Sequence, residues 1–323
     1  MTDLAEVDQA PSSKRRRRSP ASDGGSFRTR LDEKGSPWLY IAPFFIIFLI
    51  FGIFPIIYTS WVSFHDWNPL TGHSWVGLDN YTRLLTEDPR FWNAAQNTLS
   101  IWVISTIPQL AGAIMIAHLL NQAMLRFSTG FRMGVLVPQI TSVLAVAIIF
   151  NSIFGRDYGL LNWIITSLGF ERIDWQAGTL SSHVAISSMV MWRWTGYNAL
   201  IYLAAMQAIP RDLYESASID GANEWKKFTR ITIPQLRSTI IFTVIVSTIG
   251  GMQIFAEPLI FSGQGNVTGG SARQFQTLVL FLYEQGFRRF EFGYASAIAW
   301  LLFIMIMIFA LINFFLSRRI SQS

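Results

Sequence analysis

The side chains best suited to bind a small polar molecule lie within two long apolar stretches of the chain. Arg193, Tyr197 and Asn198 fall close together in the first stretch, and the four-residue spacing of Arg193 and Tyr197 places both on one face of a helix. Recognition of a sugar needs aromatic faces and amide or hydroxyl groups, because a sugar presents an apolar ring face edged by hydroxyls. This segment therefore indicates a site for a polyhydroxylated molecule.

Arg193 also has a structural interpretation. An arginine at the centre of a bilayer costs about 2.5–3.5 kcal/mol on insertion scales, so its side chain should face protein or water rather than lipid. It would then pair with a carboxylate on a neighbouring helix, and Glu257 is a candidate counter-ion. The same residue thus serves either the binding site or the packing of the helices.

The second stretch carries Gly250, Gln253 and Glu257 at positions i, i+3 and i+7, with Ser247 one turn earlier. This spacing predicts one polar stripe along a continuous helix. Gln253 and Glu257 either line a pathway or form a buried structural pair, while Gly250 and Gly251 favour close helix packing or a local unwinding.

Chemistry on a bound molecule is not indicated. The chain has no cysteine, its four histidines are scattered without metal-ligand spacing, and no Gly-Lys pair of a nucleotide-binding phosphate loop occurs. We therefore expect no catalytic residue, no metal site and no cofactor bound by this chain. A membrane enzyme is disfavoured for want of any nucleophile and base together.

The elements that position these side chains are membrane helices. Of the 323 residues, 51% are hydrophobic and 14% are charged, whereas about 25% charged is usual in soluble proteins. Six apolar segments are each long enough to cross a hydrocarbon core of about 20 helical residues. They are Trp38–Phe64, Ala94–Leu120, Phe131–Phe154, His183–Gln207, Thr239–Phe261 and Tyr294–Leu316. The fold class predicted is an all-α membrane protein with six transmembrane helices.

The basic residues set the orientation. Residues 1–36 are polar and carry the run Lys14–Arg18, which predicts a disordered basic tail. This run either binds lipid headgroups or nucleic acid, or it fixes topology as a retained cytoplasmic tail, which we favour. With the N-terminus inside, 17 Lys and Arg residues face the cytoplasm and seven face outward, so both termini are expected in the cytoplasm. Membrane lipid is then a partner and nucleic acid is not.

A polar island, residues 208–238, separates the fourth and fifth segments. Pro210 and Asp212 predict a helix start, Asp220-Gly221 a break, Asn223 the cap of a second helix and Pro234 its end. The small residues around the glycine would let another protein approach the backbone closely. They are Ser216, Ala217, Ser218, Gly221 and Ala222.

This island resembles the cytoplasmic EAA loop of permease subunits in binding-protein-dependent ABC importers. Glu215-Ser216-Ala217, then Gly221, then Ile231-Thr232-Ile233-Pro234 keep both spacings of that motif, with Ser216 for alanine and Ile233 for leucine. The likeness extends over about residues 38 to 318 and is nearest to the first permease of maltose- and glycerol-phosphate-type carbohydrate importers. Trp192–Asn198, Gly263–Gly270 and Gly293–Ala297 share it. The large extra periplasmic domain of the maltose member is missing.

The resemblance implies a type I importer permease domain over residues 37–323, in a bacterial cell membrane, moving a di- or oligosaccharide inward by alternating access. It implies a second homologous permease, an extracellular sugar-binding protein and two ATPase subunits that bind ATP and Mg²⁺. The coupling residues would be those of the motif, namely Glu215, Ser216, Ala217, Asp220, Gly221 and Ala222.

Two alternatives stay open. A secondary transporter could couple protons through Glu257 and Arg193, although six spans without a detectable inverted repeat disfavour it. The outer loops are rich in aromatic residues, among them Trp67, Trp75, Trp92, Trp163 and Trp175. These form either an interfacial aromatic belt or a docking surface for an external binding protein.

Overall fold

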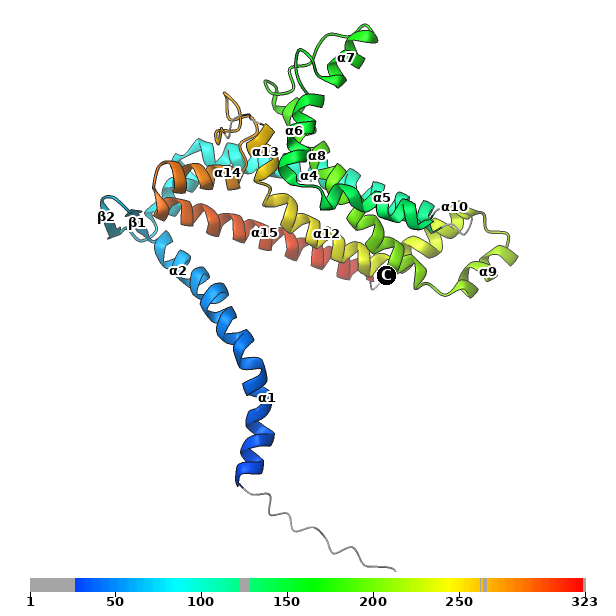
Figure 1. Ribbon diagram of the computed structural model, residues 1–323, viewed down its shortest axis with the longest axis horizontal. Helices are drawn as coiled ribbons and strands as arrows, with labels where there is room; N and C mark the ends of the chain where they lie inside the picture. Colours follow the sequence, from blue (N-terminus) through cyan, green and yellow to red (C-terminus); the bar gives the residue numbers. More distant parts are fainter. Residues whose placement is uncertain (1–26, 122–127, 262, 264–265, 322–323) are drawn as a thin grey trace, which may run out of the picture. The chain divides into compact units, whose positions relative to one another are not determined.

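A computed structural model describes residues 27–121, 128–261, 263 and 266–321, and the helices dominate it (Figure 1). The chain divides into two compact units, Met1–Ile57 and Tyr58–Ser323. The tail run Lys14–Arg18 lies outside the described residues, while helix α1 begins at Phe27, inside the predicted tail.

The first unit is built from an apolar helical run. Helix α1 (Phe27–Phe48) continues through a π-helical turn, Leu49–Ile53, into α2 (Phe54–Ser63), whose residues from Tyr58 onward belong to the second unit. Its large apolar side chains are exposed from Trp38 onward, and none of the most apolar 18-residue window is buried inside the protein. Such a surface requires lipid or another protein around it.

A short β-hairpin opens the second unit. Strand β1 (His65–Asn68) pairs antiparallel with β2 (Gly72–Trp75), so that His65 lies opposite Trp75 and Trp67 opposite His73. These four rings share one face of the hairpin, because residues two apart on a strand point the same way. Trp61 of α2 packs against that face, with its ring centroid 4.0 Å from His65 and 5.5 Å from Trp67.

The core of the second unit is a bundle of long helices: α4 (Pro89–Leu120), α8 (Thr179–Gln207), α12 (Arg237–Met252) and α15 (Phe292–Ser321). Helix α4 starts where Asp88 accepts a hydrogen bond from the Arg90 backbone N–H at 3.0 Å and Pro89 takes the first turn. Helices α4 and α8 lie side by side and bury Ala113, Ala117 and Tyr202 between them. Helix α15 joins α4 through a second apolar cluster that includes Leu278 and Phe281.

Shorter helices flank the bundle. Their bounds are α3 (Asp79–Thr82), α5 (Ser128–Ile140), α6 (Val143–Ile153), α7 (Leu160–Ser167), α9 (Arg211–Ile219), α10 (Glu224–Lys227), α11 (Ile233–Gln235), α13 (Ala256–Phe261) and α14 (Leu278–Tyr283). Further π-helical turns follow α3, α10 and α14, over Arg83–Glu87, Phe228–Thr232 and Glu284–Arg288.

Within the described residues, three helices are long and apolar enough to cross a membrane: Trp38–Ser63, Pro89–Leu120 and Phe292–Phe315. Two bent pairs would raise the number to five. They are Gly130–Ile140 with Val143–Ile153, bent by 91°, and Glu224–Gln235 with Arg237–Met252, bent by 66°. Helix α8 covers the predicted fourth span over 29 residues but is less apolar. The prediction of a multi-span helical protein is confirmed, and six spans remain a prediction.

The polar island folds as a helical arm, α9 to α11. Three of its predicted boundaries are confirmed: α9 begins after Pro210, Gly221 adopts φ +73°, and Asn223 caps α10 by accepting from the Lys226 N–H at 2.9 Å. The fourth boundary, the stop at Pro234, is met within two residues: the helix Glu224–Gln235 ends one residue after the proline, and the chain bends there by 66° into Arg237–Met252.

Candidate functional site

An ion pair between two helices marks the middle of the second unit. Arg193 of α8 donates from Nη1 to Oε1 of Glu257 in α13 at 2.9 Å, and the two side chains are 12% and 8% exposed. The predicted pairing of Arg193 with Glu257 is confirmed. Because each ion neutralises the other, the pair places no net charge in this part of the protein.

The predicted continuous stripe of Gly250, Gln253 and Glu257 is wrong. Helix α12 ends at Met252, Gln253 follows as an exposed residue with φ −104° and ψ 16°, and α13 starts only at Ala256. The interruption is held from elsewhere in the chain, since the Thr277 hydroxyl donates to the Ile254 carbonyl at 3.1 Å. Glu257 is therefore free of the register of α12 and points to Arg193.

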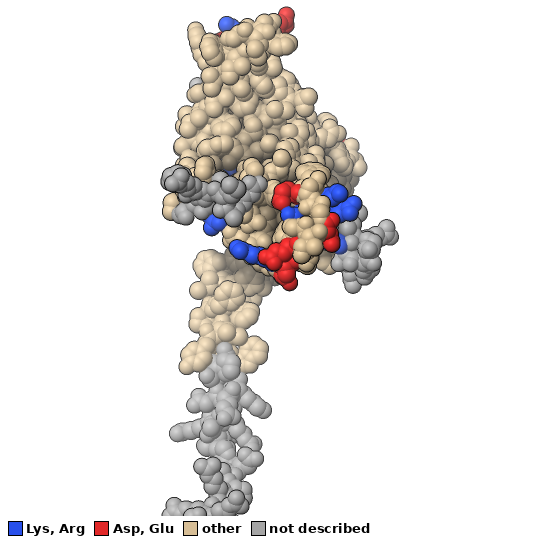
Figure 2. Space-filling model, turned by 90° about the vertical axis from the view of Figure 1, so that its right-hand side faces the viewer, with Lys and Arg blue, Asp and Glu red and all other residues tan. Residues whose placement is uncertain are grey.

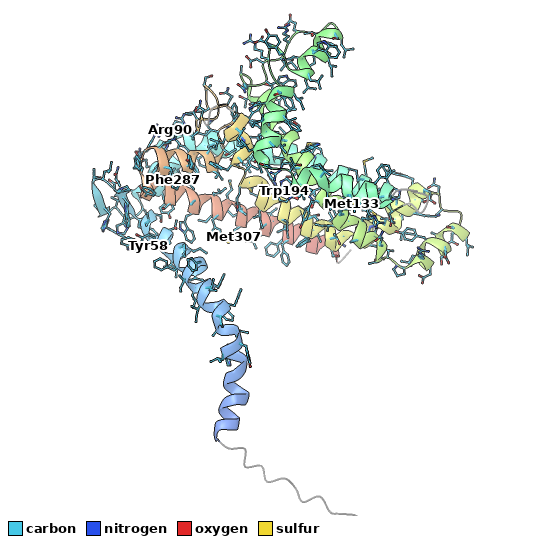
Figure 3. All side chains as sticks on the ribbon, in the orientation of Figure 1. Tyr58, Arg90, Met133, Trp194, Phe287 and Met307 are labelled. Atoms are coloured by element: carbon cyan, nitrogen blue, oxygen red, sulfur yellow. The ribbon has the colours of Figure 1, made fainter. Side chains whose placement is uncertain are left out.

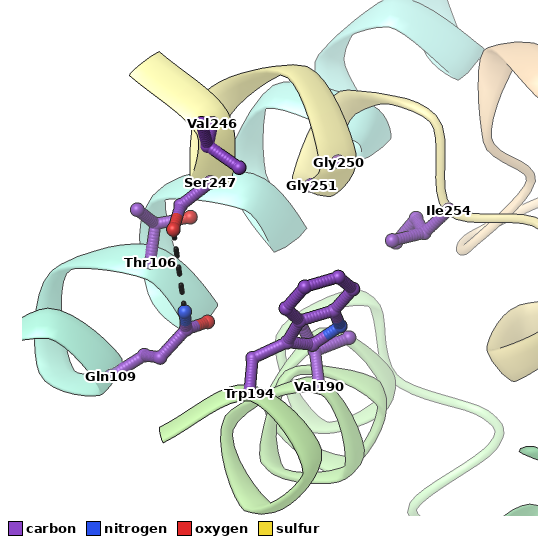
Figure 4. A pocket seen from close by; sticks show the side chains of 9 residues that line it. All are labelled: Thr106, Gln109, Val190, Trp194, Val246, Ser247, Gly250, Gly251 and Ile254. Carbon is purple, nitrogen blue, oxygen red and sulfur yellow. Dashed lines mark hydrogen bonds between the residues drawn. The ribbon is translucent and has the colours of Figure 1, made fainter. Parts of the chain in front are cut away.

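A small cavity lies between α4, α8 and α12 (Figure 4). It encloses about 20 Å³, little more than one water molecule needs. Its lining combines hydroxyl and amide groups with one indole and several apolar side chains. The lining residues are Thr106, Gln109, Val190, Trp194, Val246, Ser247, Gly250, Gly251 and Ile254.

The polar groups of this cavity face the ring of Trp194 across it. Gln109 Nε2 donates to Ser247 Oγ at 3.4 Å, a long hydrogen bond that joins α4 to α12 (Figure 4). Trp194 lies midway along α8 (Figure 3), and its ring meets that of Tyr197 edge-on at 6.0 Å. A hydroxyl-bearing ring placed between Trp194 and Gln109 would stack on the indole of Trp194 and form hydrogen bonds with the amide of Gln109.

Glycine brings α12 close to α4 here. A Cβ at Gly251 would lie 2.8 Å from Cδ1 of Trp102, so the helices could not keep this spacing with any larger residue. A Cβ at Gly250 would meet no other atom within 4 Å, so this glycine borders open space in the cavity. Gly251 therefore permits the close packing of α12 against α4, whereas Gly250 leaves space in the cavity.

The six residues predicted for the pathway divide in the structure. Ser247 lines the cavity, and Tyr197 is 40% exposed beside it. Asn198 is buried and donates to the Trp194 carbonyl at 3.2 Å, so its amide faces its own helix. Arg193 and Glu257 bind each other, and Gln253 lies outside the lining.

Sequence reasoning missed Gln109 and Trp194. Trp194 stands within the aromatic segment that drew attention to Tyr197, and Gln109 is a buried amide directly after the helix proline Pro108. A polar residue inside an apolar span is a functional candidate by default. That signal could have identified Gln109.

The helical arm forms a second candidate site, at the end of the unit where charged side chains gather (Figure 2). Glu215, Ser216 and Asp220 are exposed, while Ala217 and Ala222 are partly buried. The arm also exposes three large apolar side chains, Leu213 at 40%, Ile219 at 87% and Trp225 at 69%.

The arm is anchored to the bundle by its second half. The rings of Phe228 and His118, which belongs to α4, lie 4.6 Å apart. Within the arm, the Tyr214 hydroxyl of α9 shares a hydrogen bond of 2.9 Å with that of Thr232, which ties the first half of the arm to the second. A partner that moved the arm would therefore move the end of α4 as well.

At the other end of the bundle, two buried carboxylates, Asp88 and Glu284, accept hydrogen bonds from side chains of the segments around them. Asp88 accepts from the Arg90 guanidinium and from the Tyr294 hydroxyl, both at 2.8 Å. Burial alone would raise the pKa of Asp88, but these hydrogen bonds outweigh it and hold the pKa below its usual value.

Glu284 is held in the same manner. It accepts from Arg273 at 2.6 Å and from Gln276 at 2.7 Å. Burial opposes ionisation here as well, and the hydrogen bonds and charge of its partners again lower the pKa of the carboxyl. In the described ranges, no group of three or more His, Asp and Glu side chains is placed to hold a metal ion.

Comparison with known proteins gives one family. The family model described as binding-protein-dependent transport system inner membrane component matches residues 34–322. The lactose transport system permease protein LacF of Rhizobium radiobacter is 36% identical over 289 residues, which cover 87% of this chain and 94% of LacF. The arabinooligosaccharides transport system permease protein AraP of Bacillus subtilis is 37% identical over 287 residues, 88% of this chain and 89% of AraP.

A solved structure shares the fold. A chain from the crystal structure of a bacterial ABC transporter involved in the import of the acidic polysaccharide alginate superposes with a TM-score of 0.78. The match covers 91% of this chain and 99% of that one, at 23% sequence identity.

Proposed function

The chain belongs to the family of binding-protein-dependent transport system inner membrane components, and from that premise we propose that it is a permease subunit of an ATP-driven importer that carries a di- or oligosaccharide into the cytoplasm. The relatives named for lactose and arabinooligosaccharide transport support a sugar as cargo. No chemistry is done on the sugar by this subunit.

The observation that carries this proposal is the cavity between α4, α8 and α12. Gln109 and Ser247 offer hydrogen bonds, and Trp194 offers an aromatic face, which together match the hydroxyls and the ring face of a sugar. Its volume of about 20 Å³ is far too small for a sugar ring. In this proposal the structure holds the site in a contracted form, and transport requires α12 to separate from α4 and α8.

The helical arm supplies the coupling in this proposal. Residues Glu215 to Ala222 dock on a cytoplasmic ATPase subunit, whose surface also covers Ile219 and Trp225. Closure of two such ATPases around ATP and Mg²⁺ would shift the arm and, through the contact of Phe228 with His118, tilt the bundle. A second homologous permease completes the pore, and an extracellular binding protein delivers the sugar.

Topology follows from the same assignment. The arm and both termini lie in the cytoplasm of a bacterial cell, and α8 is a sixth span beside the three helices and two bent pairs described above. Proton coupling through Glu257 is disfavoured because Arg193 holds that carboxylate in a buried ion pair.

The test is sugar uptake by the complete complex in proteoliposomes, with binding protein outside and ATP inside. Trp194→Ala and Gln109→Ala should each lower uptake at saturating binding protein about three- to tenfold, since one lost hydrogen bond or stacking contact is worth about 0.5–1.5 kcal/mol. Trp300→Ala, on α15 and away from the cavity, is the matched control. Normal uptake by both cavity variants would disprove the location of the sugar site.

A further inference from the structure

The cargo of this cavity can be specified further by its charge. Two ionic residues lie next to the cavity lining in sequence, and they form the ion pair of α8 and α13. Arg193 directly precedes the lining residue Trp194, and Glu257 follows the lining residue Ile254 by three positions. All of the lining residues are uncharged. The charges of this pair cancel, so the described residues of α8, α12 and α13 within the bundle place no net charge next to the cavity.

We infer that this site selects uncharged sugars and rejects acidic ones such as uronates. The inference rests on the proposed function. A carboxylate on the sugar would lose its water on entering and find no uncompensated positive charge, because Glu257 at 2.9 Å from Nη1 already neutralises the Arg193 guanidinium, although the Arg193 Nε has no hydrogen-bond partner of its own. An uncharged hydroxyl at the same position would need only a neutral partner, and the Gln109 amide is one.

The geometry of the lining supports an uncharged occupant in another way. The hydrogen bond between Gln109 and Ser247 is long, at 3.4 Å, so both groups can exchange it for a sugar hydroxyl at little cost. The remaining wall, with Val190, Trp194 and Ile254, suits the apolar face of a ring. The fold itself does not decide the charge of the cargo, since the alginate importer has the same fold. The side chains must decide it.

The experiment measures equilibrium binding to the complete complex in nanodiscs without binding protein, by saturation-transfer NMR titration. Measurements are made with and without a non-hydrolysable ATP analogue, because the closed cavity must widen. The probes are lactose and maltose, each compared with the derivative that carries a carboxylate in place of the C6′ hydroxymethyl group. The neutral sugars should bind at least about tenfold more tightly than their uronates, a difference of about 1.4 kcal/mol.

Charge variants provide the decisive comparison. Glu257→Gln leaves Arg193 without its counter-ion and should shift the preference at least about tenfold toward the uronates. The double variant Arg193→Gln with Glu257→Gln removes both charges and should restore the preference for neutral sugars. Ser247→Lys places a cation on the lining without breaking the ion pair, so it tests the same shift if Glu257→Gln does not fold.

The outcomes separate the two proposals. Equal or tighter binding of the uronates by the wild-type complex would overturn the charge selectivity alone, as would a preference that neither Glu257→Gln nor Ser247→Lys alters. Absence of binding by every sugar, or binding that Trp194→Ala leaves unchanged, would overturn the sugar site itself and with it the proposal built on it.

Discussion

Replacing Arg193 with alanine should destabilise the protein by about 3–5 kcal/mol, because it removes one partner of a buried ion pair and strands the other. Glu257 is 8% exposed and has its Arg193 contact at 2.9 Å, so its charge would remain buried without compensation. At 1.4 kcal/mol for each factor of ten, the ratio of folded to unfolded protein should fall by roughly two to four orders of magnitude. Glu257→Gln should cost less, since the amide oxygen can still accept from the guanidinium.

A double variant distinguishes loss of the pair from loss of packing. Arg193→Met with Glu257→Leu replaces both ions by apolar side chains of similar volume, a change that is often neutral or stabilising by about 1–4 kcal/mol. It should therefore recover most of the stability lost in Arg193→Ala. The change in stability of the double variant, minus the changes in the single variants Arg193→Met and Glu257→Leu, measures the coupling of the two residues.

The assay is thermal unfolding of the detergent-purified complex, followed by tryptophan fluorescence and by the fraction that stays monodisperse. Thiol-reactive dyes are unsuitable for this subunit because it has no cysteine. If Arg193→Ala unfolded at the wild-type temperature, or if the double variant were no more stable than Arg193→Ala, the ion pair would not be what holds α8 to α13.

Three further predictions test other parts of the molecule. Gly221→Leu should leave the protein inserted but uncouple sugar uptake from ATP hydrolysis, because φ +73° strains any side chain there and a leucine keeps the ATPase from approaching; near-normal uptake in proteoliposomes would refute the coupling role. Because the pKa values of Asp88 and Glu284 are lowered in the folded protein, both carboxylates stabilise the fold fully above about pH 5 and lose this contribution as the pH falls below about 4 toward their folded-state pKa values. Asp88→Asn should therefore flatten the decline in unfolding temperature between about pH 5 and about pH 3. An unchanged dependence of unfolding temperature on pH would contradict this. Deleting residues 1–23 removes Lys14–Arg18 but keeps Arg28, Arg30 and Lys34 near the first apolar helix, so uptake should persist; lost uptake at normal membrane levels would reveal a function in the tail.

The local signals of the sequence were sufficient wherever a boundary depends on neighbouring residues. Pro210 precedes the start of α9, Asn223 caps α10, and Gly221 takes the left-handed conformation that follows the end of α9. Each of these effects acts within one helical turn. They could be predicted because no distant contact is needed to produce them.

The buried position of residues 274–278, which precede and begin α14, could not be predicted in this way. The backbone here is satisfied by side chains of distant helices: Asn97 of α4 donates to the carbonyls of Arg273 and Gln276, and the His183 ring bonds to the carbonyl of Gln274. The Leu278 N–H donates to the Thr98 hydroxyl at 2.9 Å. Residues 274–278 follow a glycine-rich stretch that suggests a surface loop, whereas these partners hold them buried against α4 and α8.

The same long-range contacts decide the charge of the candidate site. In a continuous helix, Glu257 would share the face of Gly250, which lines the cavity, because residues seven apart lie on one side. The carboxylate would then add a negative charge to the lining. The break after Met252, with the Ile254 carbonyl bound by Thr277, removes Glu257 from that register and delivers it to Arg193. The Thr277 hydroxyl thus contributes to a neutral cavity, and Thr277→Val, which would release the break and return Glu257 toward the lining, should strengthen the preference for uncharged sugars without any contact to the sugar itself.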